Sequence, residues 1–184
     1  MALVMVAALA ACGIFGQSGD SDYKYVKENG KLIIGYTVYA PMNYFDENGN
    51  FTGFNTELAM IVCEKLGVEP QFVEIIWDTK EVELNAKSID CIWNGLTITP
   101  ERQETMEITK PYVKNAQVVL MKKGASYDGT KSLIGKSVAA EQGSAGEDTV
   151  KADENLKQAT YVPKTLQTDC LMEVKAGTVD AAVL

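Results

Sequence analysis

The sequence of 184 residues contains no histidine. The residue type that most often acts as a general base and as a metal ligand is therefore missing. Cysteines are few and far apart, and no two of them form a CxxC pair; they are Cys12, Cys63, Cys91 and Cys170. Because a zinc site needs closely spaced ligands, we expect neither a metal nor another cofactor.

The sequence also lacks a basic segment. Its formal net charge is −8, and no block of like charges extends beyond a few residues. Nucleic acid binding needs a basic face, so we exclude it, whereas an acidic surface suits a soluble secreted protein. With 46% hydrophobic and 23% charged residues, the chain has the composition of a folded protein with one large domain or two small ones.

The first eleven residues carry no polar side chain. This run is shorter than the about 20 apolar residues that span a bilayer, and it has the length of a signal-peptide core. The segment Leu9-Ala10-Ala11-Cys12-Gly13 resembles the bacterial lipobox. That resemblance implies cleavage before Cys12 and attachment of lipid to its sulfur; the alternative is a buried helix start followed by an ordinary cysteine. A basic segment normally precedes such a core, so we expect the start of the gene to be missing or misplaced.

Residues 12–22 are rich in Gly, Ser and Asp and predict a flexible tether, with the fold beginning near Tyr23. At the other end, Leu184 lies in an apolar run typical of a strand, so we expect the chain to be cut there.

Between these ends, apolar strands alternate with helices, which predicts an α/β fold with mainly parallel sheets. The helix predicted at 56–66 is amphipathic, with Leu58, Ile61, Val62 and Leu66 on its apolar face. The predicted strands are 31–37, 70–76, 89–93, 117–121, 137–140, 161–162 and a last one from Val179; the other predicted helices are 78–86, one from Pro100, one from Ala145 and 166–175.

Residues 84–93 align without gaps to residues 174–183. Both segments have the pattern of a helix end, a turn, an Asp and an apolar strand, although only one Ala and the Asp are identical. Chance can produce such a match. The simplest physical interpretation is two lobes built on one plan, with a ligand cleft between them.

Arg102 is the first candidate binding residue. Thr99 suits a helix N-cap and Pro100 the first helical position, which would place Arg102 third, where a cation opposes the helix dipole. A bound carboxylate would reverse that cost, because a guanidinium holds it through two parallel hydrogen bonds. The alternative is an ion pair with a surface acid such as Glu101 or Glu104.

The segment Gln142-Gly143-Ser144-Ala145-Gly146 lies between a predicted strand and a predicted helix. Small residues there let backbone N–H groups approach a ligand, and a helix start favours negative charge. Many strand-to-helix loops are rich in glycine, however, so this motif alone does not indicate a site.

Two aromatic residues, Tyr39 and Trp77, each follow a predicted strand. Ligands of α/β sheets bind beyond the carboxyl ends of strands, so both residues fit a pocket wall. Trp93 is assigned to the core.

Taken in order, these segments resemble the periplasmic amino-acid-binding proteins of ABC importers, the extracellular solute-binding family 3. The similarity covers about residues 31–184. It rests on Gly53-Phe54-Asn55-Thr56-Glu57-Leu58-Ala59, Ile89-Asp90, Thr97-Ile98-Thr99-Pro100-Glu101-Arg102, Pro111-Tyr112, Gln142-Gly143-Ser144 and Gly177-Thr178-Val179-Asp180-Ala181-Ala182. The first of these has Asn and Glu where the family pattern has Asp.

The resemblance implies a type II, two-lobed fold, with lobe 1 at 23–113 and an incomplete lobe 2 at 114–184. It implies a monomeric, extracytoplasmic lipoprotein that captures an amino acid for an ABC transporter permease, and not an enzyme. A periplasmic enzyme of the same fold, similar to cyclohexadienyl dehydratase, and the sensor domain of a receptor are the alternatives.

The resemblance also implies roles for individual residues. Arg102 would bind the ligand α-carboxylate, and Gly95 would offer its carbonyl to the α-ammonium. Thr97 and Ser144 would donate hydrogen bonds. Tyr39 and Trp77 would line the side-chain pocket, and Gln142 belongs to the same binding loop. Ala145 replaces a second hydroxyl residue of many relatives.

One family residue is missing from the chain. An Asp that binds the α-ammonium would lie just beyond Leu184, so we expect the 184-residue chain to bind amino acids poorly. No acidic residue occupies 36–39, where relatives that bind cationic amino acids often carry one, which favours a neutral or polar ligand.

Overall fold

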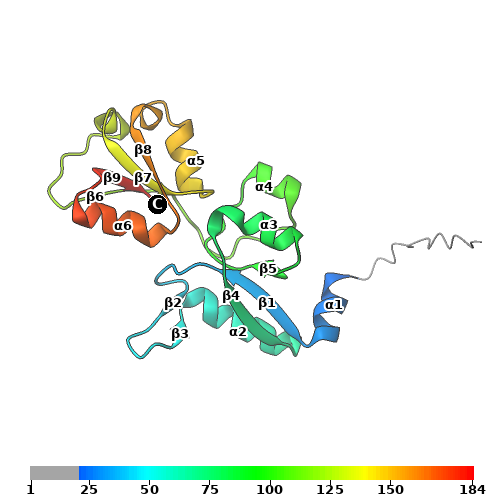
Figure 1. Cartoon of the computed structure of the whole chain (residues 1–184). Helices are drawn as coiled ribbons and strands as arrows, with labels where there is room; N and C mark the ends of the chain where they lie inside the picture. The colour runs from blue at the N-terminus through cyan, green and yellow to red at the C-terminus, as the bar shows by residue number, and fades with distance from the viewer. Residues whose placement is uncertain (1–20) are drawn as a thin grey trace, which may run out of the picture.

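The computed structural model describes residues 21–184, which form two α/β lobes side by side (Figure 1). The signal peptide predicted at 1–11, the predicted lipidation site Cys12 and the tether up to residue 20 lie outside the described residues. Within residues 21–184, no helix is both long enough and apolar enough to cross a membrane.

The first lobe contains a three-stranded parallel sheet in the order β4-β1-β5. Its elements are α1 (Asp22–Asn29), β1 (Lys31–Tyr36), β2 (Tyr44–Phe45), β3 (Phe51–Thr52), α2 (Phe54–Leu66), β4 (Glu69–Glu74), the 3-10 helix η1 (Trp77–Thr79), α3 (Lys80–Asn85), β5 (Cys91–Ile92) and α4 (Pro100–Thr105). Helix α1 was not predicted; it begins at Asp22, next to Tyr23, and the boundary of the tether at residue 22 stays a prediction. Ser21 caps this helix by accepting a hydrogen bond from the Lys24 N–H, so the helix includes Asp22, one residue before Tyr23.

Helix α2 packs on the sheet only in part through the face predicted, since Leu66 of that face packs against the core. Its buried residues are Asn55, Thr56, Ala59 and Cys63, whereas Ile61 is about half exposed. Small side chains at positions 59 and 63 let the helix approach the sheet closely, where they join a core with Ile34 of β1. The prediction was wrong for Ile61, because the fully buried positions carry the small side chains that fit against β1.

The long loop after β1 is held in place by Gly53. This residue has φ 122°, and a Cβ on it would lie 2.4 Å from the carbonyl oxygen of Met42, so no larger residue fits. The β2–β3 hairpin and the start of α2 therefore pack against the segment that follows Tyr39.

The chain passes from the first lobe to the second through residues 106–118. Tyr112 fixes the start of this connection, because its hydroxyl donates to Asn55 Oδ1 (3.0 Å) and its ring stacks on Phe54. The lobe boundary predicted between residues 113 and 114 falls within this connection, and its place along it stays a prediction.

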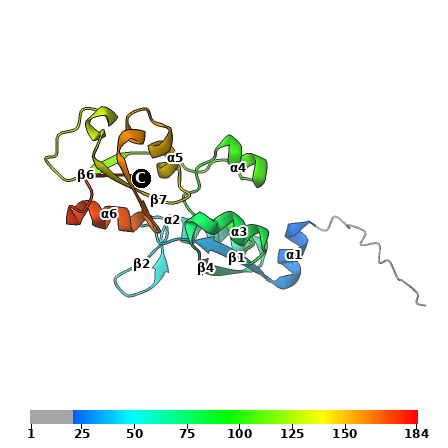
Figure 2. The same cartoon turned by 45° about the horizontal axis from the view of Figure 1, so that its top comes forward.

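The second lobe contains a four-stranded sheet in the order β6-β9-β7-β8, in which only the β6–β9 pair is antiparallel. Its elements are β6 (Val119–Met121), the 3-10 helix η2 (Thr130–Leu133), β7 (Ser137–Glu141), α5 (Ala145–Ala152), the 3-10 helix η3 (Leu156–Gln158), β8 (Thr160–Lys164), α6 (Gln167–Ala176) and β9 (Ala181–Val183). Helices α5 and α6 cover opposite faces of this sheet (Figures 1 and 2).

Strand β7 shows why the second sheet is buried on both faces. Val138 and Ala140 pack in the cluster on the α5 side, and Ala139 packs in the cluster on the α6 side. Successive side chains of a strand point to opposite faces, so a strand covered on both sides reads as a continuous apolar run. By the same alternation, Glu141 points to the same face of the sheet as Ala139, and Gln142 points to the same face as Ala140.

Candidate functional site

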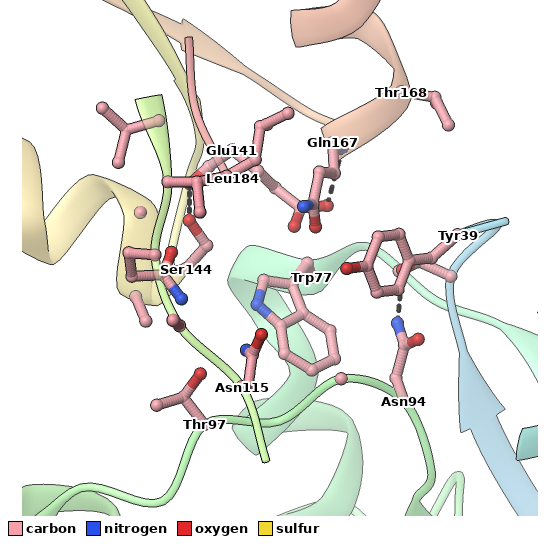
Figure 3. Close-up of a pocket in the computed structure, with 18 of the residues that line it drawn as sticks. Tyr39, Trp77, Asn94, Thr97, Asn115, Glu141, Ser144, Gln167, Thr168 and Leu184 are labelled. Atoms are coloured by element: carbon pink, nitrogen blue, oxygen red, sulfur yellow. Dashed lines mark hydrogen bonds between the residues drawn. The ribbon is translucent and has the colours of Figure 1, made fainter. Parts of the chain in front are cut away.

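A cavity of about 330 Å³ lies between the two lobes. The first lobe contributes the loop after β1, Trp77 of η1 and residues 94–102, and the second contributes the β7–α5 loop and the start of α6. Figure 3 shows Trp77 in the middle of the view, with Tyr39 and Ser144 on opposite sides of it and Glu141 and Gln167 on the wall of the second lobe. The carboxyl ends of β1 and β7 both open into this space, as the sheet topology predicts.

Arg102 is the only arginine of the chain, and it is 8% exposed on the cavity wall. The Thr99 side chain caps α4 by accepting a hydrogen bond from the Arg102 N–H (3.3 Å), as predicted. The Arg102 guanidinium then donates from Nη1 to the carbonyl oxygen of Thr97 (2.8 Å) and from Nη2 to that of Gly143 (3.2 Å).

These contacts bear on the two interpretations of Arg102, whose role in ligand binding stays a prediction. The closest acid to its guanidinium is Asp148 of α5, 3.7 Å from Nη2, and the salt bridges of residues 21–184 include none with Glu101 or Glu104. The side chain therefore turns inward from the first lobe and reaches the second. Since a guanidinium has five N–H donors, and two of them bond here to carbonyl oxygens, donors remain for a further acceptor.

Lys80 is a second buried cation, and sequence analysis did not select it. It is 4% exposed, and its Nζ donates to the carbonyl oxygens of Gly143 (2.9 Å) and Trp77 (3.2 Å). Nζ also lies 4.9 Å from the centroid of the Trp77 ring. Burial, with the nearby charge of Arg102, lowers the pKa of Lys80. A lysine in a short predicted helix is ordinarily exposed. The only feature of the sequence that could have indicated a place for Lys80 at the cavity is its position three residues after Trp77.

Glu141 is a buried carboxylate in the cavity wall, and it too was missed. It is 5% exposed at the end of β7, where Oε1 accepts a hydrogen bond from the backbone N–H of Gln167 (3.2 Å). Burial raises the pKa of Glu141 to about 7, an effect that the Gln167 hydrogen bond and the charge of Lys80 oppose and that of Asp169 reinforces. Its position as a charged residue at the end of an apolar strand could have made Glu141 a candidate. The predicted binding loop, however, began one residue later, at Gln142.

The structure places six of the seven predicted site residues around the cavity. Tyr39, Trp77, Gly95, Thr97, Arg102 and Ser144 line it. Gln142 does not, because its side chain is exposed and its backbone N–H donates to the carbonyl oxygen of Lys164 at the end of β8. The prediction for Gln142 is thus not supported, and strand alternation gives the cavity position to Glu141.

Ser144 is already engaged within its own loop. Its hydroxyl donates to the carbonyl oxygen of Glu141 (2.7 Å) and accepts from the Glu147 N–H (3.2 Å), which caps α5. Its backbone N–H also points to the Glu141 carbonyl (3.3 Å). A ligand would have to exchange these contacts to receive hydrogen bonds from Ser144.

Trp93 packs beside the core of the first lobe, as assigned from the sequence. Asn94, the next residue, lines the cavity; its side-chain N–H donates to the Thr37 hydroxyl (2.5 Å), while its Oδ1 is buried without a hydrogen-bond partner. Among residues 21–184, no group of three or more Cys, Asp or Glu could hold a metal ion. The site thus offers a guanidinium, a carboxylate, an amide and aromatic faces.

The two lobes and the polar cavity between them define a two-lobed binding protein of the type II periplasmic class. Comparison with known proteins identifies the family. The model of the bacterial extracellular solute-binding proteins, family 3, matches residues 32–169, and the chain belongs to this family.

Curated relatives agree with this assignment. The chain is 29% identical over 178 residues to the arginine-binding extracellular protein ArtP of Bacillus subtilis (strain 168), covering 96% of this chain and 67% of that protein. It is 27% identical over 188 residues to the L-cystine-binding protein TcyJ of Escherichia coli (strain K12), covering 100% of this chain and 70% of that protein. The chain therefore spans about two thirds of the length of these relatives.

Solved structures show the same fold. Holo ArgBP from T. maritima has a TM-score of 0.80 and 33% identity, covering 87% of this chain and 71% of that chain. The ancestral amino acid-binding protein AncCDT-1, a precursor of cyclohexadienyl dehydratase, has a TM-score of 0.84 and 30% identity, covering 89% of this chain and 74% of that chain.

Proposed function

We propose that the protein captures a free amino acid outside the cytoplasm and delivers it to an ABC transporter permease. The observation that carries this proposal is Arg102, a buried guanidinium on the wall of an interlobe cavity with N–H donors to spare. The relatives reported above are named for binding arginine, cystine or amino acids in general, so their names support the ligand class without fixing the ligand.

In this proposal, Arg102 receives the α-carboxylate in a charge-assisted, two-bond contact. The Gly95 carbonyl accepts from the α-ammonium, and Thr97 and Ser144 supply further hydrogen bonds. Tyr39 and Trp77 cover the ligand side chain. A zwitterion is costly to desolvate unless a polar group of the protein contacts each of its two charges. The groups that contact the α-carboxylate and the α-ammonium therefore decide whether binding occurs.

Closure of the lobes is the proposed mechanism. Arg102 and Lys80 of the first lobe both donate hydrogen bonds to the Gly143 carbonyl of the second lobe. These contacts between the lobes would help to hold a closed state together. A ligand that touches both lobes stabilises this closed state by its higher affinity for it, and the permease would recognise that state.

The cellular location is part of the same proposal. Cleavage before Cys12 and attachment of lipid to its sulfur would anchor a monomeric protein at the outer face of the bacterial membrane. Labelling with a radioactive fatty acid tests this point, because a Cys12→Ser variant should lose the label. A labelled variant would contradict it.

The test of ligand capture uses the full-length product of the gene that encodes this chain. A thermal-shift screen with the common amino acids should show a higher Tm with at least one of them, because a ligand that binds only the native state stabilises it. Titration calorimetry should then show at least about thirtyfold weaker binding for Arg102→Met, the equivalent of about 2 kcal/mol.

The control variant is Lys131→Gln, which removes a surface cation paired only with exposed Asp128. It should bind like the wild type. If no amino acid raises the Tm, or if Arg102→Met binds as tightly as the control, the proposed function is wrong.

One observation favours a second candidate, an enzyme similar to cyclohexadienyl dehydratase. Glu141 lines the cavity and has a pKa raised by burial to about 7, a value that suits a general acid. Turnover of prephenate or arogenate by the full-length gene product would support this candidate, and loss of turnover in Glu141→Gln would assign the proton donor.

A further inference from the structure

Glu141 presents an unusual charge to the cavity. It is 5% exposed, and the ion pairs formed within residues 21–184 do not include it. Acidic residues are rarely buried to this extent without a paired cation. The hydrogen bond from the Gln167 N–H satisfies part of the carboxylate, which has room for several donors.

The neighbouring charges do not neutralise Glu141 by contact. Lys80 attracts it electrostatically, but the ammonium of Lys80 is bound to the carbonyl oxygens of Gly143 and Trp77 and is surrounded by other acids, Asp78, Glu81 and Asp148. The other charge that acts on Glu141 is that of Asp169, which has the same sign. The carboxylate therefore lacks a cationic partner at contact distance.

The direction of the Glu141 side chain makes the cavity the place for such a partner. Figure 3 shows Glu141 and Gln167 on the wall of the second lobe, with their polar ends toward Trp77. Trp77 and Tyr39 add aromatic faces to the same space, and aromatic faces attract cations as well as apolar groups.

We infer that Glu141 makes the cavity selective for an amino acid whose side chain ends in a cation, a guanidinium or an ammonium. This inference rests on the proposed function: with the α-carboxylate at Arg102, the side-chain cation donates hydrogen bonds to the Glu141 carboxylate. The preference for a neutral ligand, drawn from residues 36–39, considered only the first lobe. The acidic group of this cavity comes from the second.

Selectivity of this kind depends on pH in a defined direction. Burial raises the pKa of Glu141 to about 7, with the Gln167 N–H and Lys80 opposing and Asp169 reinforcing this effect. A cationic ligand binds the ionised carboxylate, so its affinity rises with pH through this range. From pH 6 to pH 8 the gain is roughly tenfold, because about nine tenths of a group with this pKa is protonated at pH 6.

The test compares matched ligands on the full-length gene product by titration calorimetry at pH 8. Arginine is paired with citrulline and lysine with norleucine, because each second ligand has nearly the shape of the first without its side-chain cation. We expect the wild type to prefer the cationic ligand of at least one pair by about tenfold or more, the equivalent of about 1.4 kcal/mol. Glu141→Gln should reduce that ratio to less than about threefold, because the cationic ligand loses more affinity than the neutral one.

Glu154→Gln is the control, since Glu154 is exposed and pairs with Lys157 at the surface. It should keep the wild-type ratio. Equal binding of both members of each pair, an equal loss for both in Glu141→Gln, or binding restricted to amino acids outside these pairs would overturn the inference while the proposed function stands. Absence of binding to every amino acid would overturn both.

Discussion

The two lobes are built on the same unit but supply opposite chemistry to the cavity. In the first lobe β1, β4 and β5 form a parallel sheet with β1 in the centre, and in the second β7, β8 and β9 repeat that order with β7 in the centre. The first lobe nevertheless contributes the cations Arg102 and Lys80, and the second contributes the Gly143 carbonyl and the Glu141 carboxylate.

The shared unit includes the same aspartate contact. Asp90 accepts a hydrogen bond from the N–H of Ile33 on β1, and Asp180 accepts one from the N–H of Ser137 on β7, both at 2.8 Å. In both lobes the N–H of this aspartate also donates to the carbonyl oxygen of the same partner residue. The similarity of residues 84–93 to residues 174–183 therefore reflects the same contact in both lobes, in which an aspartate just before β5 or β9 is hydrogen-bonded to the central strand β1 or β7.

The lobes differ in the loop that follows the central strand. In the first lobe, residues 37–53 form a long loop with the β2–β3 hairpin, and in the second the three residues Gln142–Ser144 lead directly into α5. The repeated three-stranded unit therefore fixes where a ligand contacts each lobe. The loops after β1 and β7 determine which chemical groups it contacts there.

The largest effect is expected from neutralising the charge of the second lobe. Glu141 has a pKa near 7 in the folded protein and an ordinary value of 4.5, so ionisation destabilises the ligand-free fold. Stability that is complete below pH 4.5 is lost as pH rises to about 7, which amounts to about 3 kcal/mol. Urea unfolding should show Glu141→Gln to be more stable than wild type by this order at pH 8 and similar at pH 4.5. A constant difference between the variants across this range would exclude titration of Glu141 as the cause.

A second change separates the lobes at Gly143. This residue has φ 68°, and a Cβ on it would lie 2.9 Å from Asp78 Oδ1 and 3.0 Å from Asp78 Cα in the first lobe. Gly143→Ala should therefore destabilise the protein by about 1–3 kcal/mol through backbone strain, and the clash should also open the cavity. Gly135→Ala is the matched control, because Gly135 has φ 70° with no atom within 4 Å. Urea unfolding and small-angle scattering should show the larger radius of gyration only for Gly143→Ala; equal behaviour of both variants would mean that position 143 does not hold the lobes together.

Asp90 and Asp180 make the same contact in the two lobes, so their substitution allows a direct comparison of the lobes. Asp90→Ala removes an acceptor from a partly buried N–H and should cost about 1.5–3 kcal/mol, the range for hydrogen bonds to charged groups. Asp180→Ala should cost less, because that contact is exposed to water and the Ser137 N–H can be solvated after the change. Chemical denaturation of both variants at pH 7 gives the ranking. A larger loss for Asp180→Ala would show that solvent exposure does not govern the strength of this contact.

The smallest change in stability is expected for Lys80→Met. Burial lowers the pKa of Lys80, which means that holding this charge in the fold has a cost, and Met fills a similar volume. We expect stability to change by less than about 1 kcal/mol. Loss of the bond to the Gly143 carbonyl should still favour the open form, measurable by energy transfer between dyes on the two lobes. An unchanged dye distance would show that Arg102 alone is sufficient for this cross-lobe contact.

Much of the fold could be predicted because local chemistry is strong where periodicity is clear. The Thr99 cap, the Pro100 start of α4 and the Gly177 end of α6 lie where the sequence placed them. Helix α1 was missed, since its eight residues expose nearly every side chain and only Val26 is buried. The face of α2 was predicted only in part: Leu66 packs against the core, but Ile61 is exposed because small side chains at positions 59 and 63 fit against the sheet.

The site divides in the same way between sequence and structure. Residue type and the position in the first turn of a helix made Arg102 a candidate anion ligand, and strand ends made Tyr39 and Trp77 candidates for the cavity wall. Strand alternation within β7 places Glu141 rather than Gln142 at the cavity. The burial of Lys80 and the meeting of two cations at one carbonyl were decided only when the lobes packed together. The reason is physical: backbone preferences act over a few residues, whereas desolvation of a charged group depends on atoms that lie far away in the chain and near in space.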